Sequence, residues 1–371
     1  MLLRRTAAAA LAAFSALAIA ASPAPATRPA ALYGTADPTY DGVWRQSYAL
    51  LALHAADTPP AEGAVAWLAG QQCADGGFAS YRADPTVPCD AGAEDTNATG
   101  IAVQALAAHG EDFAAKRGAD WLAKVQNPDG GWSYNPGGTT DADSTGVAVG
   151  ALKAAGTDVK SVTTDGMSPY DALRSLQIPC GHQDGGAFTH QRPGGAGAPA
   201  ANAKATADAV RAAEGAGFVV EAPAQDMPPR PACEGSAADA GAAWLVRQLG
   251  AGGGYFSSGP QAPDFGTTAD AVVALAAGGH LDAARDTYNW LAGHAEGWSQ
   301  DNPAALAQLA LAAYATDNPT RDPITRLSAL LPPPRQRAES SGGDSAWWLA
   351  GAGLVAVLCL GVLLAGRKTR I

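Results

Sequence analysis

The stretch Trp121-Leu-Ala-Lys-Val-Gln126-Asn-Pro-Asp-Gly-Gly-Trp132 recurs along the 371-residue chain and decides its fold. The segment from Trp67 to Phe78 repeats it, with the same spacing of eleven residues between the two aromatic positions and with a glutamine at the fifth step. Self-similarity of this kind is the sequence signature of a repeat architecture. We therefore interpret the chain as a series of related supersecondary units.

Three further copies are less regular. The third has an insertion around Cys180, the fourth runs from Trp244 to Tyr255, and the fifth is shortened to the segment from Trp290 to Trp298. The glycine pair permits a tight turn, and the aromatic ring that follows can fill the gap between adjacent units. We assign a structural role in the repeat to Gln72, Phe78, Gln126, Trp132, Gln177, Phe188, Trp244 and Tyr255.

A second recurring segment lies between these turns and begins with threonine. It runs Thr-Gly-Ile-Ala-Val-Gln-Ala-Leu from Thr99 and Thr-Gly-Val-Ala-Val-Gly-Ala-Leu from Thr145, with related copies from Thr206 and Thr268. Small residues on nearly every side indicate helices that pack closely against several neighbours. These segments are therefore predicted to be inner helices, and the tryptophan-bearing segments to be outer ones.

The two kinds of segment together predict an all-α protein. The first and last helical hairpins are no more polar than the middle ones, whereas an open array would need polar capping units at its ends. We therefore predict an α6/α6 toroid of six hairpins over residues 41–331. The twelve predicted helices span residues 43–56, 60–71, 96–109, 112–126, 143–155, 167–177, 203–216, 236–249, 267–278, 281–293, 302–316 and 322–331.

The repeated pattern resembles the QW repeat of the terpenoid cyclase and protein prenyltransferase superfamily, also known as the prenyltransferase/squalene oxidase repeat. The resemblance covers nearly all of residues 41–331 and implies the α/α toroid of that superfamily. The fourth copy has Gln248 one step early, and the fifth has lost its glutamine. The resemblance therefore supports the fold better than it supports an activity.

Both ends of the chain carry targeting signals. Arg4 and Arg5 precede an apolar run and a small-residue site ending at Ala26, which predicts a signal peptide over residues 1–26 and a linker over 27–40. Residues 346–366 are uncharged and apolar, which predicts a transmembrane helix after a flexible stalk at 332–345. The basic tail at 367–371 should stay cytoplasmic. We expect a single-pass cell-membrane protein with an extracellular ectodomain.

The exported part is strongly acidic. Without the five basic residues at the two ends it carries a net charge of about −16. This charge argues against nucleic acids and anionic lipid headgroups as partners. The sequence also contains no cofactor motif, and we expect no cofactor.

Four cysteines fall in the predicted ectodomain, which suggests disulfides in an oxidising compartment. The preferred pairing joins Cys73 to Cys89 and Cys180 to Cys233, each pair closing a loop insertion. The alternative is a metal site, which would need close Cys and His pairs beyond Cys180 and His182. We expect no metal.

The segment Asp141-Ala-Asp143-Ser144-Thr145 resembles the DxDD(T) acid motif of squalene-hopene-type cyclases. The resemblance implies a catalytic pair in which Asp143 is the general acid and Asp141 lies beside it, although Ser144 replaces the last aspartate. The alternative is that Asp143 or Ser144 caps the helix that follows. Asp95 precedes the neighbouring inner helix in the same way, which favours the capping interpretation.

Three functions remain open at this stage. The first is a non-catalytic binder of a bulky or hydrophobic small molecule or lipid in the ring, passed on to a membrane transporter. The inner helices resemble those of cobalamin carriers, which makes cobalamin a named candidate ligand. The second is an exported class II terpenoid cyclase, and the third is a structural ring for protein interaction. The candidate ligand-binding residues are Asp95, Thr99, Asp141, Asp143, Thr145, Thr206 and Thr268.

Overall fold

The computed structural model describes residues 31–194, 197–228, 235–259 and 262–331. The predicted signal peptide, stalk, transmembrane helix and basic tail lie outside these residues. Within them, no helix is both long enough and apolar enough to cross a membrane.

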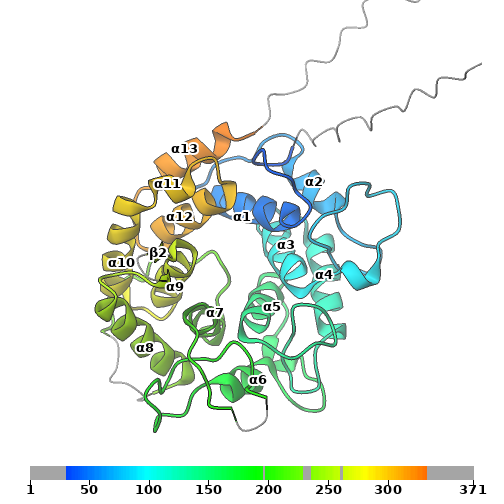
Figure 1. Cartoon of the computed structure of the whole chain (residues 1–371). Helices are drawn as coiled ribbons and strands as arrows, with labels where there is room; N and C mark the ends of the chain where they lie inside the picture. The colour runs from blue at the N-terminus through cyan, green and yellow to red at the C-terminus, as the bar shows by residue number, and fades with distance from the viewer. Residues whose placement is uncertain (1–30, 195–196, 229–234, 260–261, 332–371) are drawn as a thin grey trace, which may run out of the picture.

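The described part of the chain forms a closed ring of two concentric layers of helices (Figure 1). The inner layer consists of α1 (Gly42–Ala55), α3 (Thr96–Ala108), α5 (Ala142–Ala154), α7 (Ala203–Ala213), α9 (Phe265–Ala277) and α12 (Pro303–Ala315). The outer layer consists of α2 (Ala64–Gly70), α4 (Asp112–Lys124), α6 (Pro169–Leu176), α8 (Ala237–Ala251), α10 (Leu281–His294) and α13 (Arg321–Ala329). Each inner helix contacts the next, and α12 contacts α1, so the ring closes.

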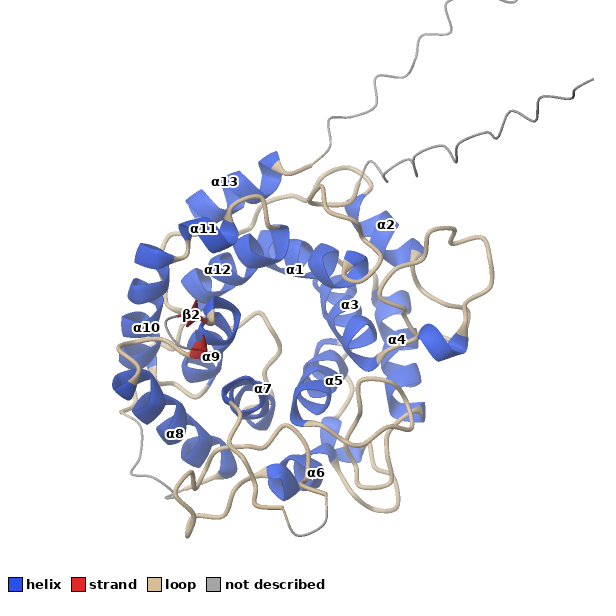
Figure 2. Ribbon diagram, viewed as in Figure 1, coloured by secondary structure: helices blue, strands red, loops and turns tan. Residues whose placement is uncertain are grey.

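All twelve predicted helices are present, and the α6/α6 arrangement is confirmed. The sequence did not predict several short elements: the single turn α11 (Glu296–Ser299), the 3-10 turns η1 (Ala91–Ala93) and η2 (Val159–Ser161), and a small hairpin of β1 (Ser257–Gly259) and β2 (Ala262–Pro263). Figure 2 shows how little strand the ring contains.

The start of the described chain helps to close the ring. Residues 31–34 were predicted to belong to a linker, yet Leu32 and Tyr33 are buried, and the backbone N–H of Gly34 donates to the carbonyl of Leu330 in the last hairpin. The side chain of Gln46 binds this segment from α1, accepting from the backbone N–H of Tyr33 at 3.0 Å. This segment is therefore part of the fold.

Small residues allow the inner helices to approach closely. A Cβ added to Gly100 on α3 would lie 2.6 Å from Cγ1 of Val147 on α5, and one added to Gly146 would lie 2.9 Å from the carbonyl oxygen of Asp208 on α7. Contacts this short exclude any side chain. The alanine and glycine content of the predicted inner helices therefore sets the radius of the ring.

The repeat glutamines join neighbouring hairpins. Nε2 of Gln126 donates to the carbonyl of Gly130 in its own turn and to that of Val162 ahead of the next outer helix. Gln72 and Gln177 each make the same pair of bonds, one to a turn glycine and one to the next outer segment. The predicted structural role of these glutamines therefore has a geometric basis, which is cross-linking of adjacent repeats.

The aromatic residue after the glycine pair is buried in each of the first four repeats. Phe78, Trp132 and Phe188 are fully buried, as predicted. In the fourth repeat the equivalent residue is Phe256 rather than Tyr255, because the backbone N–H of Phe256 makes the bond to the inner-helix threonine. Tyr255 stacks on Trp290 instead, with ring centroids 4.3 Å apart. The prediction was therefore one residue out at this turn.

One of the two predicted disulfides is described completely. Cys73 and Cys89 are bonded to each other, with their Cα atoms 5.7 Å apart. Cys180 is also disulfide-bonded, and its predicted partner, Cys233, lies outside the described residues.

Candidate binding site at the mouth of the ring

The six inner helices begin at one end of the ring, because each is followed by an outer helix that returns in the opposite direction. We call this end the mouth. The residues immediately before the six helices are all Asp or Asn. They are Asp41, Asp95, Asp141, Asn202, Asp264 and Asn302.

Five of these six residues cap their helices through their side chains. The side chain of Asp95 accepts from the backbone N–H of Ala98, and that of Asp141 accepts from the backbone N–H of Ser144, each at 2.6 Å. The capping interpretation of the acidic segment is thus confirmed. The assignment of the cap to Asp143 or Ser144 is wrong. The N-cap of α5 is Asp141, whose own backbone is extended and which directly precedes the first helical residue.

Because Asp141 makes the cap, Asp143 is able to face the space enclosed by the six inner helices, which we call the bore. One of its carboxylate oxygens, Oδ2, lies 3.2 Å from Nδ1 of His190, in the loop between α6 and α7. The other, Oδ1, is buried without a hydrogen-bond partner. Burial, together with the nearby Asp208 carboxylate, raises the pKa of Asp143 to about 6.

A polar network continues from Asp143 into the bore. Lys204 on α7 bonds to the carboxylate of Asp208 one turn further on, and its Nζ lies 3.2 Å from Oδ2 of Asp270 on α9. Nε2 of Gln308 on α12 donates to Oδ1 of Asp270 at 3.2 Å. Side chains from four inner helices, α5, α7, α9 and α12, therefore form this network.

Further from the mouth, the bore is closed by a side chain from the segment after α7. The ring of Phe218 packs edge-on against Tyr48 and Trp44 of α1, with centroids 5.0 and 6.0 Å away. On the opposite wall, the guanidinium of Arg211 lies 4.1 Å from its centroid. Figure 2 shows a loop inside the circle of inner helices. The ring is therefore not an open channel from its mouth to its other end.

Two adjoining cavities occupy the mouth. The larger, which we call the acid cavity, has a volume of about 430 Å³. It is lined by Asn97, Ser133, Tyr134, Asn135, Gly138, Thr139, Asp141, Asp143, Ser144, His190 and Gln191. The smaller, which we call the aromatic cavity, has a volume of about 180 Å³. It is lined by Tyr40, Asp41, Trp44, Ser80, Asp95, Asn97, Ala98 and Tyr134.

Asn97 and Tyr134 belong to both cavities and join them. Oδ1 of Asn97, like Oδ1 of Asp143, is a buried acceptor without a hydrogen-bond partner. Such groups cost free energy unless a donor reaches them. Both residues line the acid cavity, so hydrogen-bond donors brought to that cavity would offset this cost.

The mouth carboxylates are held in an environment that disfavours their charged form. Burial raises the pKa of Asp95 to about 6, against the hydrogen bonds it accepts. Burial also raises the pKa of Asp141 and that of Asp41, although Arg45 lies 3.2 Å from Asp41. A positively charged ligand group would relieve this cost for all of these acids at once.

The four threonines predicted to bind ligand serve the scaffold instead. The hydroxyl of Thr145 accepts from the backbone N–H of Trp132 at 3.0 Å and donates to the carbonyl of Asp141 at 2.6 Å. Equivalent bonds tie the other three to their own turns and caps, and all four side chains are fully buried. The structure therefore brings together Asp95, Asp141 and Asp143 and leaves out Thr99, Thr145, Thr206 and Thr268.

One group at the mouth has the composition of a metal site. Ligand atoms of Asp141, Asp143 and His190 lie within 4.8 Å of one another. Two carboxylates and one imidazole suit a divalent first-row cation, and all three residues line the acid cavity. A second such group includes Cys73 and Cys89, whose sulfurs are already joined in the disulfide.

Sequence reasoning missed the network inside the bore. Lys204, Asp208 and Arg211 lie four and three residues apart, on one face of an otherwise alanine-rich helix. Charged residues at that spacing inside a helix predicted to be buried were the available signal. His190 gave no such signal, because its loop meets α5 only in the folded chain, where the backbone N–H of Ala142 donates to the carbonyl of His190.

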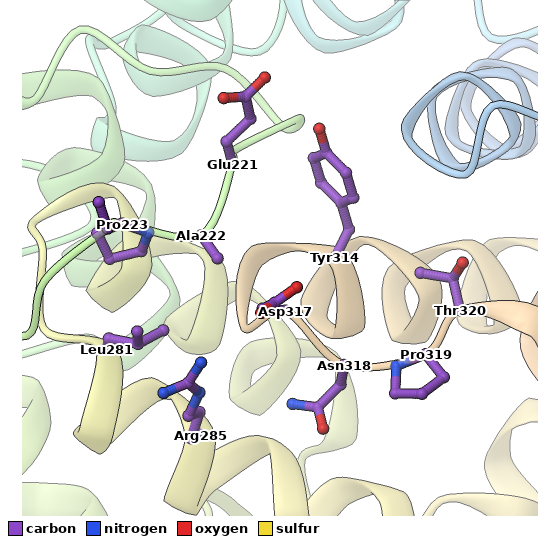
Figure 3. Close-up of a pocket in the computed structure, with 11 residues that line it drawn as sticks. Glu221, Ala222, Pro223, Leu281, Arg285, Tyr314, Asp317, Asn318, Pro319 and Thr320 are labelled. Carbon is purple, nitrogen blue, oxygen red and sulfur yellow. The ribbon is translucent and has the colours of Figure 1, made fainter.

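Another cavity, of about 620 Å³, lies at the other end of the ring. Figure 3 shows its lining, in which Glu221 comes from the segment after α7 and Tyr314 from the end of α12. Arg285 also lines it, and Nε of this arginine donates to the carbonyl of Thr316. None of the site residues predicted from the sequence lines this cavity.

Comparison with known proteins supports the fold family. The family model of the squalene-hopene cyclase C-terminal domain matches residues 36–142 of this chain, and the matched region ends before Asp143. The ent-copalyl diphosphate synthase from Streptomyces platensis is similar in structure, with a TM-score of 0.50 and 20% identity over 74% of this chain. This chain spans about half of that synthase, covering 50% of its length.

A protein from Actinoplanes is also similar, with a TM-score of 0.49 and 17% identity over 77% of this chain and 93% of that one. No curated protein matches the sequence. With the closed ring and the repeats, the similarity to the synthase defines the fold: it is a terpenoid cyclase-like α/α toroid, and residues 36–142 are similar to the squalene-hopene cyclase C-terminal domain.

Proposed function

We propose that this protein is a non-catalytic binder of a small molecule, which it holds at the mouth of the ring. The observation that carries the proposal is the pair of buried, unsatisfied acceptors, Oδ1 of Asn97 and Oδ1 of Asp143, beside the two joined cavities. The expected ligand presents N–H donors, such as amines or primary amides. It lies across the mouth, because Phe218 closes the bore behind it.

Cobalamin, the candidate named by resemblance, presents primary amides at its edge and is too bulky to enter a cavity of about 430 Å³ completely. It would have to lie across the mouth with its amides reaching Asn97 and Asp143. We also propose that the ring acts outside the cell, held by its C-terminal span, and passes its ligand to a membrane transporter.

The alternative function is acid catalysis of the class II cyclase type. Its support is Asp143, whose pKa is raised to about 6 and whose carboxylate contacts His190. A polyene and its cationic intermediates need an apolar lining. The acid cavity is instead lined by amides, hydroxyls and carboxylates, which favours binding over cyclisation.

The test is native mass spectrometry of the full-length chain purified from its own membrane, compared with the Asp143→Asn and Asn97→Leu variants. The wild type should carry a small molecule whose binding both substitutions weaken. The control is Tyr314→Leu, which changes a side chain in the cavity at the other end of the ring and should leave the molecule bound. Turnover of a polyene that Asp143→Asn abolishes would instead establish the cyclase. A chain that carries nothing and turns over nothing would leave the structural ring.

A further inference from the structure

The aromatic cavity differs in chemistry from the acid cavity beside it. Three aromatic side chains line it, Tyr40 and Trp44 from the start of the first hairpin and Tyr134 from the loop before α5. Two carboxylates, those of Asp41 and Asp95, line it as well. Aromatic faces next to acids are the surroundings in which proteins hold alkylammonium groups.

The position of the indole in this cavity is fixed from behind. Trp44 contacts Tyr48 edge-on, with ring centroids 5.3 Å apart, and Phe218 supports it at 6.0 Å. Phe218 is held in turn by its backbone N–H, which donates to Oε1 of Gln104 at 2.9 Å. The wall of the cavity is therefore preorganised, which lowers the cost of binding.

The acids at the cavity are also fixed. Oδ1 of Asp95 accepts from the backbone N–H of Ala98, and Oδ2 accepts from the hydroxyl of Ser80 at 3.2 Å. Both oxygens are therefore oriented by the scaffold. Oδ1 of Asn97, which has no hydrogen-bond partner, belongs to a residue that lines the same cavity from the first turn of the helix.

The local charge is negative in spite of the helix N-termini. The two cavities together are lined by Asp41, Asp95, Asp141 and Asp143. Against these four carboxylates stand the full charge of Arg45 and the N-termini of three inner helices, and each N-terminus is equivalent to roughly half a positive charge. Lys204 is not counted here, because it is paired with Asp208 and Asp270. With all four acids ionised, the mouth retains a net charge of roughly −1.5.

We propose that the aromatic cavity binds an alkylammonium group, so that the ligand of this ring is an organic cation. The inference rests on the proposed binding function and specifies its ligand class. A volume of about 180 Å³ accommodates a methylated ammonium head. The remainder of the ligand extends past Asn97 and Tyr134 into the acid cavity, where Asp143 and its neighbours supply acceptors.

The test compares choline with its neutral isostere, 3,3-dimethylbutan-1-ol, by titration calorimetry on the full-length chain. Because the two probes differ in charge and hardly in shape, choline should bind more tightly by roughly threefold to thirtyfold. Tyr134→Leu should remove this preference and Tyr134→Phe should retain it. Tyr314→Leu, a matched change in the cavity at the other end of the ring, should leave it unchanged.

Equal affinity for the two probes would overturn the inference, as would a choline preference that Tyr134→Leu leaves intact. Absence of choline binding would also overturn it. In each of these cases, a native ligand that depends on Asp143 would still support the proposed function, so the two failures are distinguishable.

Discussion

The buried carboxylate of Asp95 makes the stability of the ring depend on pH. Its side chain is only 2% exposed, and burial raises its pKa to about 6 from an ordinary value of 3.8. The native state therefore holds this proton more tightly than the unfolded state does. The stabilising contribution is complete below about pH 4 and is lost as the pH rises to about 6. A difference of about two pKa units corresponds to about 3 kcal/mol.

Asp95→Asn should remove this dependence. Asparagine has the same shape and is an equally good helix cap, so the bond from the backbone N–H of Ala98 can remain. We expect the variant to match the wild type at pH 4 and to exceed its free energy of unfolding by up to about 3 kcal/mol at pH 8. Urea denaturation of the full-length chain between pH 4 and pH 8, followed by circular dichroism, measures the difference.

The matched control is Asp264→Asn, which alters the cap of α9 in the same way, where Asp264 accepts from the backbone N–H of Thr267. Equal stability of Asp95→Asn and the wild type at pH 8 would contradict the buried-charge explanation. Destabilisation of the variant by the same amount at every pH would also contradict it, because that result would reflect loss of a cap and not relief of a buried charge.

Three further substitutions test the scaffold by urea denaturation at pH 7. Gln126→Ala removes the bonds to Gly130 and Val162 and should cost about 2 kcal/mol, whereas the exposed Gln191→Ala should cost little. Thr145→Val keeps the shape of the side chain but leaves the backbone N–H of Trp132 without its acceptor, so the free energy of unfolding should fall by about 1–3 kcal/mol. An unchanged urea midpoint would refute the structural role of the Thr145 hydroxyl. Phe218→Ala should lower the free energy of unfolding by about 3–5 kcal/mol, and Phe218→Leu should lower it distinctly less. Equal losses would show that the phenyl ring of Phe218 does not fill the bore.

The architecture could be predicted from the sequence because the motifs that specify it are local and repeated. The Gln126 segment, its glycine pair and its aromatic residue lie within a dozen positions, and the turn is closed by bonds from this segment and from the threonine of the inner helix that follows. The alanine-rich segments indicated which helices must pack on several sides. Where a repeat was irregular, at Tyr255 and Phe256, local spacing alone assigned the wrong aromatic residue.

The candidate site could be predicted from the sequence only in part. Asp95, Asp141 and Asp143 stood out because acids at the start of a helix are a local pattern, and the structure places all three at the mouth. The shared threonines drew attention for the same reason, yet their hydroxyls are used by the turns. Sequence periodicity does not distinguish a repeated scaffold bond from a repeated ligand contact.

The sequence by itself therefore determined the repeat, the twelve helices and the end of the ring at which their acidic caps gather. The tertiary structure decided what occupies the middle of the ring. His190 meets Asp143, and Phe218 meets Trp44, only in the folded chain, because each pair comes from separate elements. The physical reason is that helix formation and turn closure depend on neighbours in the chain, whereas the charge and shape of the bore depend on side chains from opposite walls.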